Sequence, residues 1–173
     1  EEASGNKVIK LMDKSGKATQ FYAGQSSYPL NITEPFTIEA RFKTDNAGLS
    51  IYPFFMYNSD GTRSMAGRLH QGKLTDYTGA VVGTYTANKW FNLKVEITPD
   101  TADKKGTCKL YLNDKLVSEQ PMQSTFTSLR NIAVAELAYA NGSSLYVDDL
   151  MICDVELETT KELPKFTPVE NPF

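Results

Sequence analysis

The chain has 173 residues, a length that suits one domain and can bury a core without disulfides or metals. Its formal net charge is −3, and no basic run or stripe is present, which argues against a nucleic-acid partner. No apolar run approaches the roughly 20 residues that span a bilayer, so we expect no membrane span. The chain opens at Glu1 without an initiator Met or a signal peptide, which predicts a mature product or an excised domain.

Apolar and polar residues alternate between turn residues along the chain, a pattern typical of half-buried β-strands. The stretch 36–44 is the clearest case, and Pro53 suggests an edge or a bulge in the stretch that contains it. The Ala-rich stretch 129–139 could be helical by propensity, but the turns that flank it favour a strand. The expected strands are 7–12, 18–22, 36–44, 49–58, 65–70, 73–77, 81–86, 90–98, 107–112, 115–119, 129–139 and 145–155.

Many short strands and no convincing helix predict an all-β fold, either a sandwich or a barrel. We expect a single domain over residues 1–160, followed by a Pro-containing tail or linker over residues 161–173. The pattern therefore indicates two antiparallel sheets, each of which hides one side of its strands.

The two cysteines, Cys108 and Cys153, have no CxxC spacing, and a single histidine excludes the usual zinc clusters. Cys108 alternates with Leu110 and Leu112, which predicts a buried thiol. A Cys108–Cys153 disulfide is the alternative, and it needs the two strands within about 6 Å of each other.

Several segments, in this order, resemble the concanavalin A-like, LamG-like jelly-roll superfamily. They are NKVIKLMD at 6–13, FTIEARF at 36–42, KWFNLKV at 89–95, KLYLND at 109–114 and LYVDDLMI at 145–152. The resemblance spans nearly the whole chain and implies a two-sheet antiparallel jelly-roll sandwich. The relatives that it implies are accessory modules of secreted polysaccharide lyases and glycoside hydrolases. It thus implies an extracellular, cell-surface or periplasmic place and a glycan-related role, but it fixes no ligand.

No catalytic constellation is visible. Glycoside hydrolysis needs two carboxylates that flank one bond, and no E-x-D-x-x-E run is present. A lyase needs a base and a cation. The only place for this pair is at Arg68 and His70, which Arg41 could join from another strand. The hydroxyl of Tyr77 or Tyr111 could act as the acid. We therefore expect no catalytic residues, and keep a lyase or hydrolase acting on the concave face as the alternative.

Residues opposite in parity to the expected core are candidates for binding a glycan. Arg41 and Arg68 are favoured because a guanidinium can fork onto a carboxylate, which favours an acidic glycan. The alternative is that all of them form the solvated side of a half-buried sheet. The full candidate set is Glu39, Arg41, Arg68, His70, Tyr111 and Tyr146.

A structural calcium ion is also expected, because hard cations take carboxylate oxygens and related sandwiches carry an ion near their joined termini. Asp13 and Asp149 would supply the carboxylates, with turn and strand-end hydrogen bonds as the alternative. The sequence thus predicts a monomeric, non-catalytic carbohydrate-binding or accessory module for a polysaccharide or oligosaccharide. A surface adhesion or structural domain is a further alternative.

Overall fold

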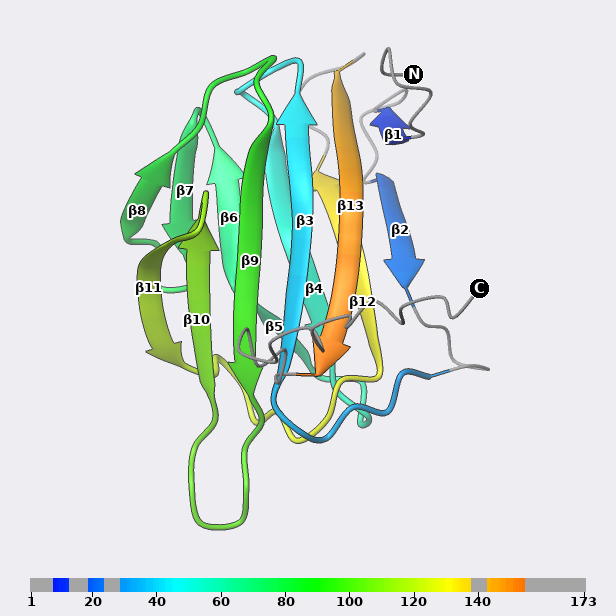
Figure 1. The fold of residues 1–173 in the computed structure, drawn as a ribbon, viewed down its shortest axis with the longest axis vertical. Coiled ribbons are helices and arrows are strands. Elements are labelled where there is room, and N and C mark those ends of the chain that lie inside the picture. The colour runs from blue at the N-terminus through cyan, green and yellow to red at the C-terminus, as the bar shows by residue number, and fades with distance from the viewer. Residues whose placement is uncertain (1–7, 13–18, 24–28, 138–142, 155–173) are drawn as a thin grey trace, which may run out of the picture.

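The fold is a sandwich of two antiparallel β-sheets, seen in a computed structural model that describes residues 8–12, 19–23, 29–137 and 143–154. Figure 1 shows the two sheets as stacked layers, with β3, β9 and β13 in front of β4, β6 and β12. Within the described ranges, no helix has the length and apolar character needed to cross a membrane. The two sheets confirm the expected all-β class.

The front layer is a six-stranded sheet, and the back layer is a seven-stranded sheet. In spatial order the front layer contains β1 (Ile9–Met12), β13 (Ser144–Asp154), β3 (Phe36–Thr44), β9 (Phe91–Thr98), β10 (Thr107–Leu112) and β11 (Lys115–Pro121). The back layer contains β2 (Thr19–Ala23), β12 (Asn131–Leu137), β4 (Ser50–Tyr57), β6 (Gly67–His70), β7 (Lys73–Asp76) and β8 (Val81–Thr84), and β5 (Arg63–Met65) pairs with β4. Strands far apart in sequence, such as β3 and β13, are neighbours, as in a jelly roll.

The predicted alternation along β3 is confirmed, since every second side chain from Phe36 to Thr44 is buried. Two other predictions are refined by the structure. The stretch 65–70 is divided at Ala66 into β5 and β6, and the Ala-rich stretch 129–139 contains β12, so its helical alternative is wrong. The predicted tail 161–173 and the domain boundary lie outside the described residues.

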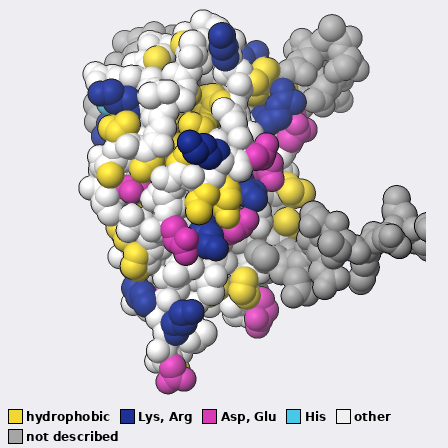
Figure 2. Space-filling view, turned by 60° about the vertical axis from the view of Figure 1, so that its left-hand side comes forward, with side chains coloured by type: hydrophobic (Ala, Val, Ile, Leu, Met, Phe, Trp, Pro, Cys, Tyr) yellow, Lys and Arg dark blue, Asp and Glu magenta, His cyan; other side chains and the backbone are white. Residues whose placement is uncertain are grey.

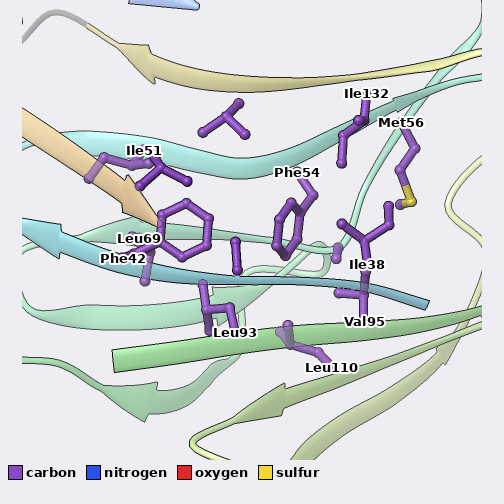
Figure 3. Packing of buried hydrophobic residues seen from close by; sticks show 14 of the residues in the cluster. Ile38, Phe42, Ile51, Phe54, Met56, Leu69, Leu93, Val95, Leu110 and Ile132 are labelled. Carbon is purple, nitrogen blue, oxygen red and sulfur yellow. The ribbon is translucent and has the colours of Figure 1, made fainter. Parts of the chain in front are cut away.

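The core lies between the sheets, where Figure 3 shows side chains from both layers pointing toward one another. Phe42 on β3 meets Phe54 on β4 edge-to-face, with ring centroids 5.5 Å apart. Both side chains are essentially fully buried, and burying a side chain of this size stabilises the fold by roughly 1.5–3 kcal/mol. The pair therefore fixes one sheet against the other.

Pro53 marks a bulge in β4 and not a sheet edge. Ala133 on β12 pairs with Phe55, but Ala135 pairs with Tyr52, so β4 carries one extra residue between them. Because a bulge shifts the side-chain alternation by one residue, Tyr52 and Phe55 both point away from the core while Phe54 points into it.

Cys108 is buried and Cys153 is half-buried, and both are free thiols. The predicted buried thiol is confirmed, and the disulfide alternative is wrong. Cys108 lies on β10 and Cys153 on β13, with β3 and β9 between them. The two strands are thus three inter-strand spacings of about 4.8 Å apart, and together these spacings exceed the reach of a disulfide.

Candidate functional site

The predicted ligand residues do not form one site, because the structure distributes them over two opposite faces. Arg68 and His70 lie on β6 and point outward from the seven-stranded sheet, opposite in parity to the fully buried Leu69. The others lie on the outside of the six-stranded sheet: Glu39, Arg41, Tyr111 and Tyr146. The core separates the two groups, so the expected joint action of Arg41 and Arg68 on one ligand is wrong.

On the outside of the seven-stranded sheet, the rings of Tyr52 and Phe55 stack with centroids 4.8 Å apart and planes inclined by 30°. The Arg68 guanidinium carbon lies 5.8 Å from the Tyr52 ring centroid, and its Nε donates a hydrogen bond of 2.7 Å to Ser50 Oγ. His70 Nδ1 lies 3.4 Å from the Leu49 carbonyl oxygen. The bulge in β4 brings the two rings to one face, and the alternation along β6 brings a guanidinium and an imidazole to the same face.

A hollow of about 410 Å³ opens beside the stacked rings. The Arg63 guanidinium carbon lies 5.9 Å from the Phe55 ring centroid, at the opposite end of the pair from Arg68. The hollow is lined by Tyr52, Phe55, Arg63, Ser64, Met65, Gln123 and Ser124. We call the group Tyr52, Phe55, Arg63, Arg68 and His70 the Tyr52–Phe55 surface.

The sequence did not indicate Arg63 or Gln123 as site residues. It also did not decide which of the aromatic side chains between Tyr52 and Tyr57 point into the core and which point outward. Pro53 was the available signal, because a proline inside a strand pattern indicates a bulge that re-aims the side chains beyond it. No pattern in the sequence brings Gln123 next to β5, since that contact depends on how the loop after β11 crosses the sandwich. The amide oxygen of Gln123 accepts a hydrogen bond of 3.3 Å from the Met65 backbone N–H.

On the opposite face, Tyr111 is committed to a polar network. Its hydroxyl donates a hydrogen bond of 2.7 Å to Glu96, and Lys94 donates one of 2.9 Å to the same carboxylate. Burial first, and then the Glu96 carboxylate, raise the pKa of Tyr111 to about 12. A phenol with so high a pKa is a weak proton donor, which argues against the acid role that the lyase alternative offered to Tyr111.

The remaining predicted residues on this face are also engaged. Glu39 accepts a hydrogen bond of 2.5 Å from Asn92, and Arg41 donates one of 3.2 Å to Asp149. Tyr146 lies beneath the ammonium groups of Lys10 and Lys43. Figure 2, which brings the β8 and β11 side of the molecule forward, shows acidic and basic side chains interspersed with hydrophobic ones.

No contact among the described residues joins the two expected calcium ligands. Asp13 lies outside the described residues, and Asp149, at a bulge in β13 with φ of 51°, pairs with Arg41. Within the described ranges, no three His, Cys, Asp or Glu side chains are grouped so that they could hold a metal ion. Calcium binding through Asp13 and Asp149 stays a prediction.

No protein-family model and no curated protein matches the chain. Solved structures do. A sialidase matches with a TM-score of 0.65 and 10% identity over 86% of this chain, which spans 15% of the sialidase chain. An endo-β-1,4-glucuronan lyase from the fungus Trichoderma reesei matches with a TM-score of 0.62 and 12% identity, over 85% of this chain and 81% of the lyase. The carbohydrate recognition domain of Emp46p matches with a TM-score of 0.55 and 14% identity, over 87% of this chain and 86% of that chain.

At these identities the similarity shows the fold alone. The element order, the two antiparallel sheets and these matches define a jelly-roll sandwich with the concanavalin A-like fold. The predicted fold class and the structural resemblance are therefore confirmed.

Proposed function

We propose that the chain is a non-catalytic carbohydrate-binding or accessory module that holds a polysaccharide or oligosaccharide on the Tyr52–Phe55 surface. The observation that carries the proposal is the stacked pair Tyr52–Phe55, with a guanidinium at each end and a hollow beside it. Aromatic rings offer apolar faces to sugar rings, and nearby polar groups fix the orientation of a ligand.

Arg63 and Arg68 favour an acidic glycan, because a guanidinium presents several donors in a fork that matches a carboxylate. The fold neighbours support a carbohydrate ligand, since they include a glucuronan lyase and a carbohydrate recognition domain. We place the module, as a monomer, in an extracellular or cell-surface system that uses glycans.

Binding is favoured over catalysis by how the polar groups are held. β-Elimination needs a base and a proton donor that converge on one substrate atom. His70 and Arg68 make contacts to the start of β4, through Leu49 and Ser50. Tyr111, one of the two acids considered for the lyase alternative, lies on the other face with its hydroxyl bonded to Glu96. We infer that Arg68 and His70 orient a ligand and do not act as base and acid.

A glycan array, followed by calorimetry on the glycans that bind, tests the proposal. We expect Tyr52→Ala and Arg68→Ala each to weaken binding by roughly tenfold or more, since a lost ring contact or charged hydrogen bond is worth about 1.5–3 kcal/mol. Tyr111→Ala is the matched control, because it removes the same ring from the opposite face. Thermal melting verifies that each variant is folded.

An absorbance assay for unsaturated uronate products runs on the same glycans. New absorbance would show a lyase and would overturn the non-catalytic proposal. Loss of binding in Tyr111→Ala with full binding in Tyr52→Ala would move the site to the other sheet.

A further inference from the structure

A row of alternating cations and rings crosses the outside of the six-stranded sheet. Lys10 on β1 pairs in register with Tyr146 on β13, which pairs with Lys43 on β3. Trp90, just before β9, and Arg41 complete the sequence. We call Lys10, Tyr146, Lys43, Trp90 and Arg41 the cation–aromatic row.

The cations of the row are held over the rings at short distances. Lys43 Nζ lies 4.9 Å from the Tyr146 ring centroid and 4.7 Å from that of Trp90, so one ammonium is shared by two rings. Lys10 Nζ lies 5.3 Å from the Tyr146 centroid, and the Arg41 guanidinium carbon lies 4.9 Å from the Trp90 centroid. The rings thus restrict the positions that the ammonium and guanidinium groups can take.

The two lysines of the row are not balanced by carboxylates in the described part of the chain. Arg41 pairs with Asp149 at 3.2 Å, but no ion pair joins Lys10 or Lys43 to an acidic residue in the part of the chain that the structure describes. Further along the same face the arrangement is different, because Lys94 pairs with Glu96 at 2.9 Å. A ring attracts a cation without neutralising it, so Lys10 and Lys43 keep their positive charge in a chain whose net charge is −3.

We propose that the cation–aromatic row is a second binding surface, which takes an anionic polysaccharide along the row. Lys10 and Lys43 lie two strands apart, about 10 Å at the usual inter-strand spacing, which is on the scale of a disaccharide. The ammonium groups would meet carboxylate or sulfate groups of the polymer, and Tyr146 and Trp90 would hold these ammonium groups in position. This inference does not rest on the Tyr52–Phe55 surface, which lies on the opposite face.

Two binding surfaces on opposite faces have a consequence that one surface lacks. A single domain would then bridge two polymer chains, one held by each face. The charge of the two lysines would also steer an anionic polymer to this face, with an effect that salt weakens.

Affinity electrophoresis in gels that contain dextran sulfate, polygalacturonic acid or unsubstituted dextran tests the inference. We expect retardation by one or both polyanions, no retardation by dextran, and weaker binding at higher salt. The polyanion that retards more identifies sulfate or carboxylate as the preferred group. Lys43→Gln should weaken binding by roughly tenfold, as expected when one charged contact is lost, and Lys10→Gln by less. Lys115→Gln, an exposed lysine on β11, is the matched charge control and should bind like the wild type.

The inference is overturned if the unmodified chain binds neither polyanion, or if Lys43→Gln and Lys115→Gln bind equally well. Binding that is lost in Tyr52→Ala and kept in Lys43→Gln would overturn it while leaving the proposed function intact. A single-stranded oligodeoxythymidine included in the gels gives the last outcome. Lys43-dependent retardation by this oligonucleotide, with none by the polysaccharides, would replace a glycan with nucleic acid.

Discussion

The carboxylate of Asp76 on β7 accepts a hydrogen bond of 3.1 Å from the hydroxyl of Ser118 on β11, which joins the two sheets at one side of the sandwich. The other carboxylate oxygen accepts bonds from the Thr78 hydroxyl and from the backbone N–H groups of Thr78 and Ala80. Asp76 is only 4% exposed. One acidic side chain therefore closes the turn after β7 and ties it to the facing layer.

Replacing Asp76 should destabilise the fold. Asp76→Ala removes the charged acceptor of these hydrogen bonds, and one hydrogen bond to a charged group contributes about 1.5–3 kcal/mol. Asp76→Asn keeps an oxygen for the turn and should cost less. Chemical denaturation measures both free energies of unfolding. Equal stability of Asp76→Ala and the wild type would show that water replaces these bonds.

Acid should destabilise the protein through several carboxylates whose pKa is lowered on folding. For Asp76 and Glu96, burial acts to raise the pKa, but hydrogen bonds outweigh it, from Thr78 and Ser118 in one case and from Tyr111 and Lys94 in the other. A group whose pKa is lower in the folded state stabilises it above the unfolded pKa. That contribution is lost as the pH falls below about 4 toward the folded value.

The melting temperature should therefore be flat near neutral pH and fall in this acid range. Asp76→Asn cannot ionise at this position, so its melting temperature should fall less steeply than that of the wild type. Parallel curves for the two proteins would contradict the assigned role of the Asp76 carboxylate.

Phe54 and Phe55 are adjacent but should respond very differently to truncation. Phe54 is 1% exposed and packs against Phe42, so Phe54→Ala should cost about 3–5 kcal/mol. Phe55 points outward and is half-buried, so Phe55→Ala should cost clearly less. Denaturation midpoints compare the two variants directly. The reverse order would mean that the bulge at Pro53 is misplaced.

Thiol labelling should separate the two cysteines. Burial raises the pKa of Cys108 to about 12, and the thiolate is the reactive form, so Cys108 should stay unlabelled in the folded protein. Cys153 is half-buried and should react slowly. A disulfide reagent should therefore titrate one thiol before denaturation and both afterwards. In Cys153→Ser, rapid labelling of the native protein would show that Cys108 is accessible.

The sequence was sufficient to predict most of the fold. The alternation along β3, the strand at β9 and the buried Cys108 followed from which residue types occupy every second position. Alternation reports which side chains of one strand share a face, because successive side chains point to opposite sides of a sheet. In the Ala-rich stretch of β12 the flanking turns, and not alternation, indicated a strand, and pairing with β4 and β2 overrode the helix propensity.

The candidate site was predicted only in part, because alternation cannot tell which sheet a strand joins. Arg41 and Arg68 share an outward parity, yet β3 and β6 belong to different layers, and their side chains leave the sandwich in opposite directions. In the sequence, Lys43 does not differ from any other outward-facing lysine. Its position between Tyr146 and Trp90 was therefore not predicted.

By itself, then, the sequence determined that the chain forms strands with one apolar side each, since local residue order dictates the spacing of side chains along a strand. Only the tertiary structure decided which outward side chains meet. Contacts such as Tyr52 with Phe55, or Lys10 with Tyr146, depend on a bulge and on pairing between strands far apart in the chain. Such pairing is selected by packing the whole core, which no local pattern encodes.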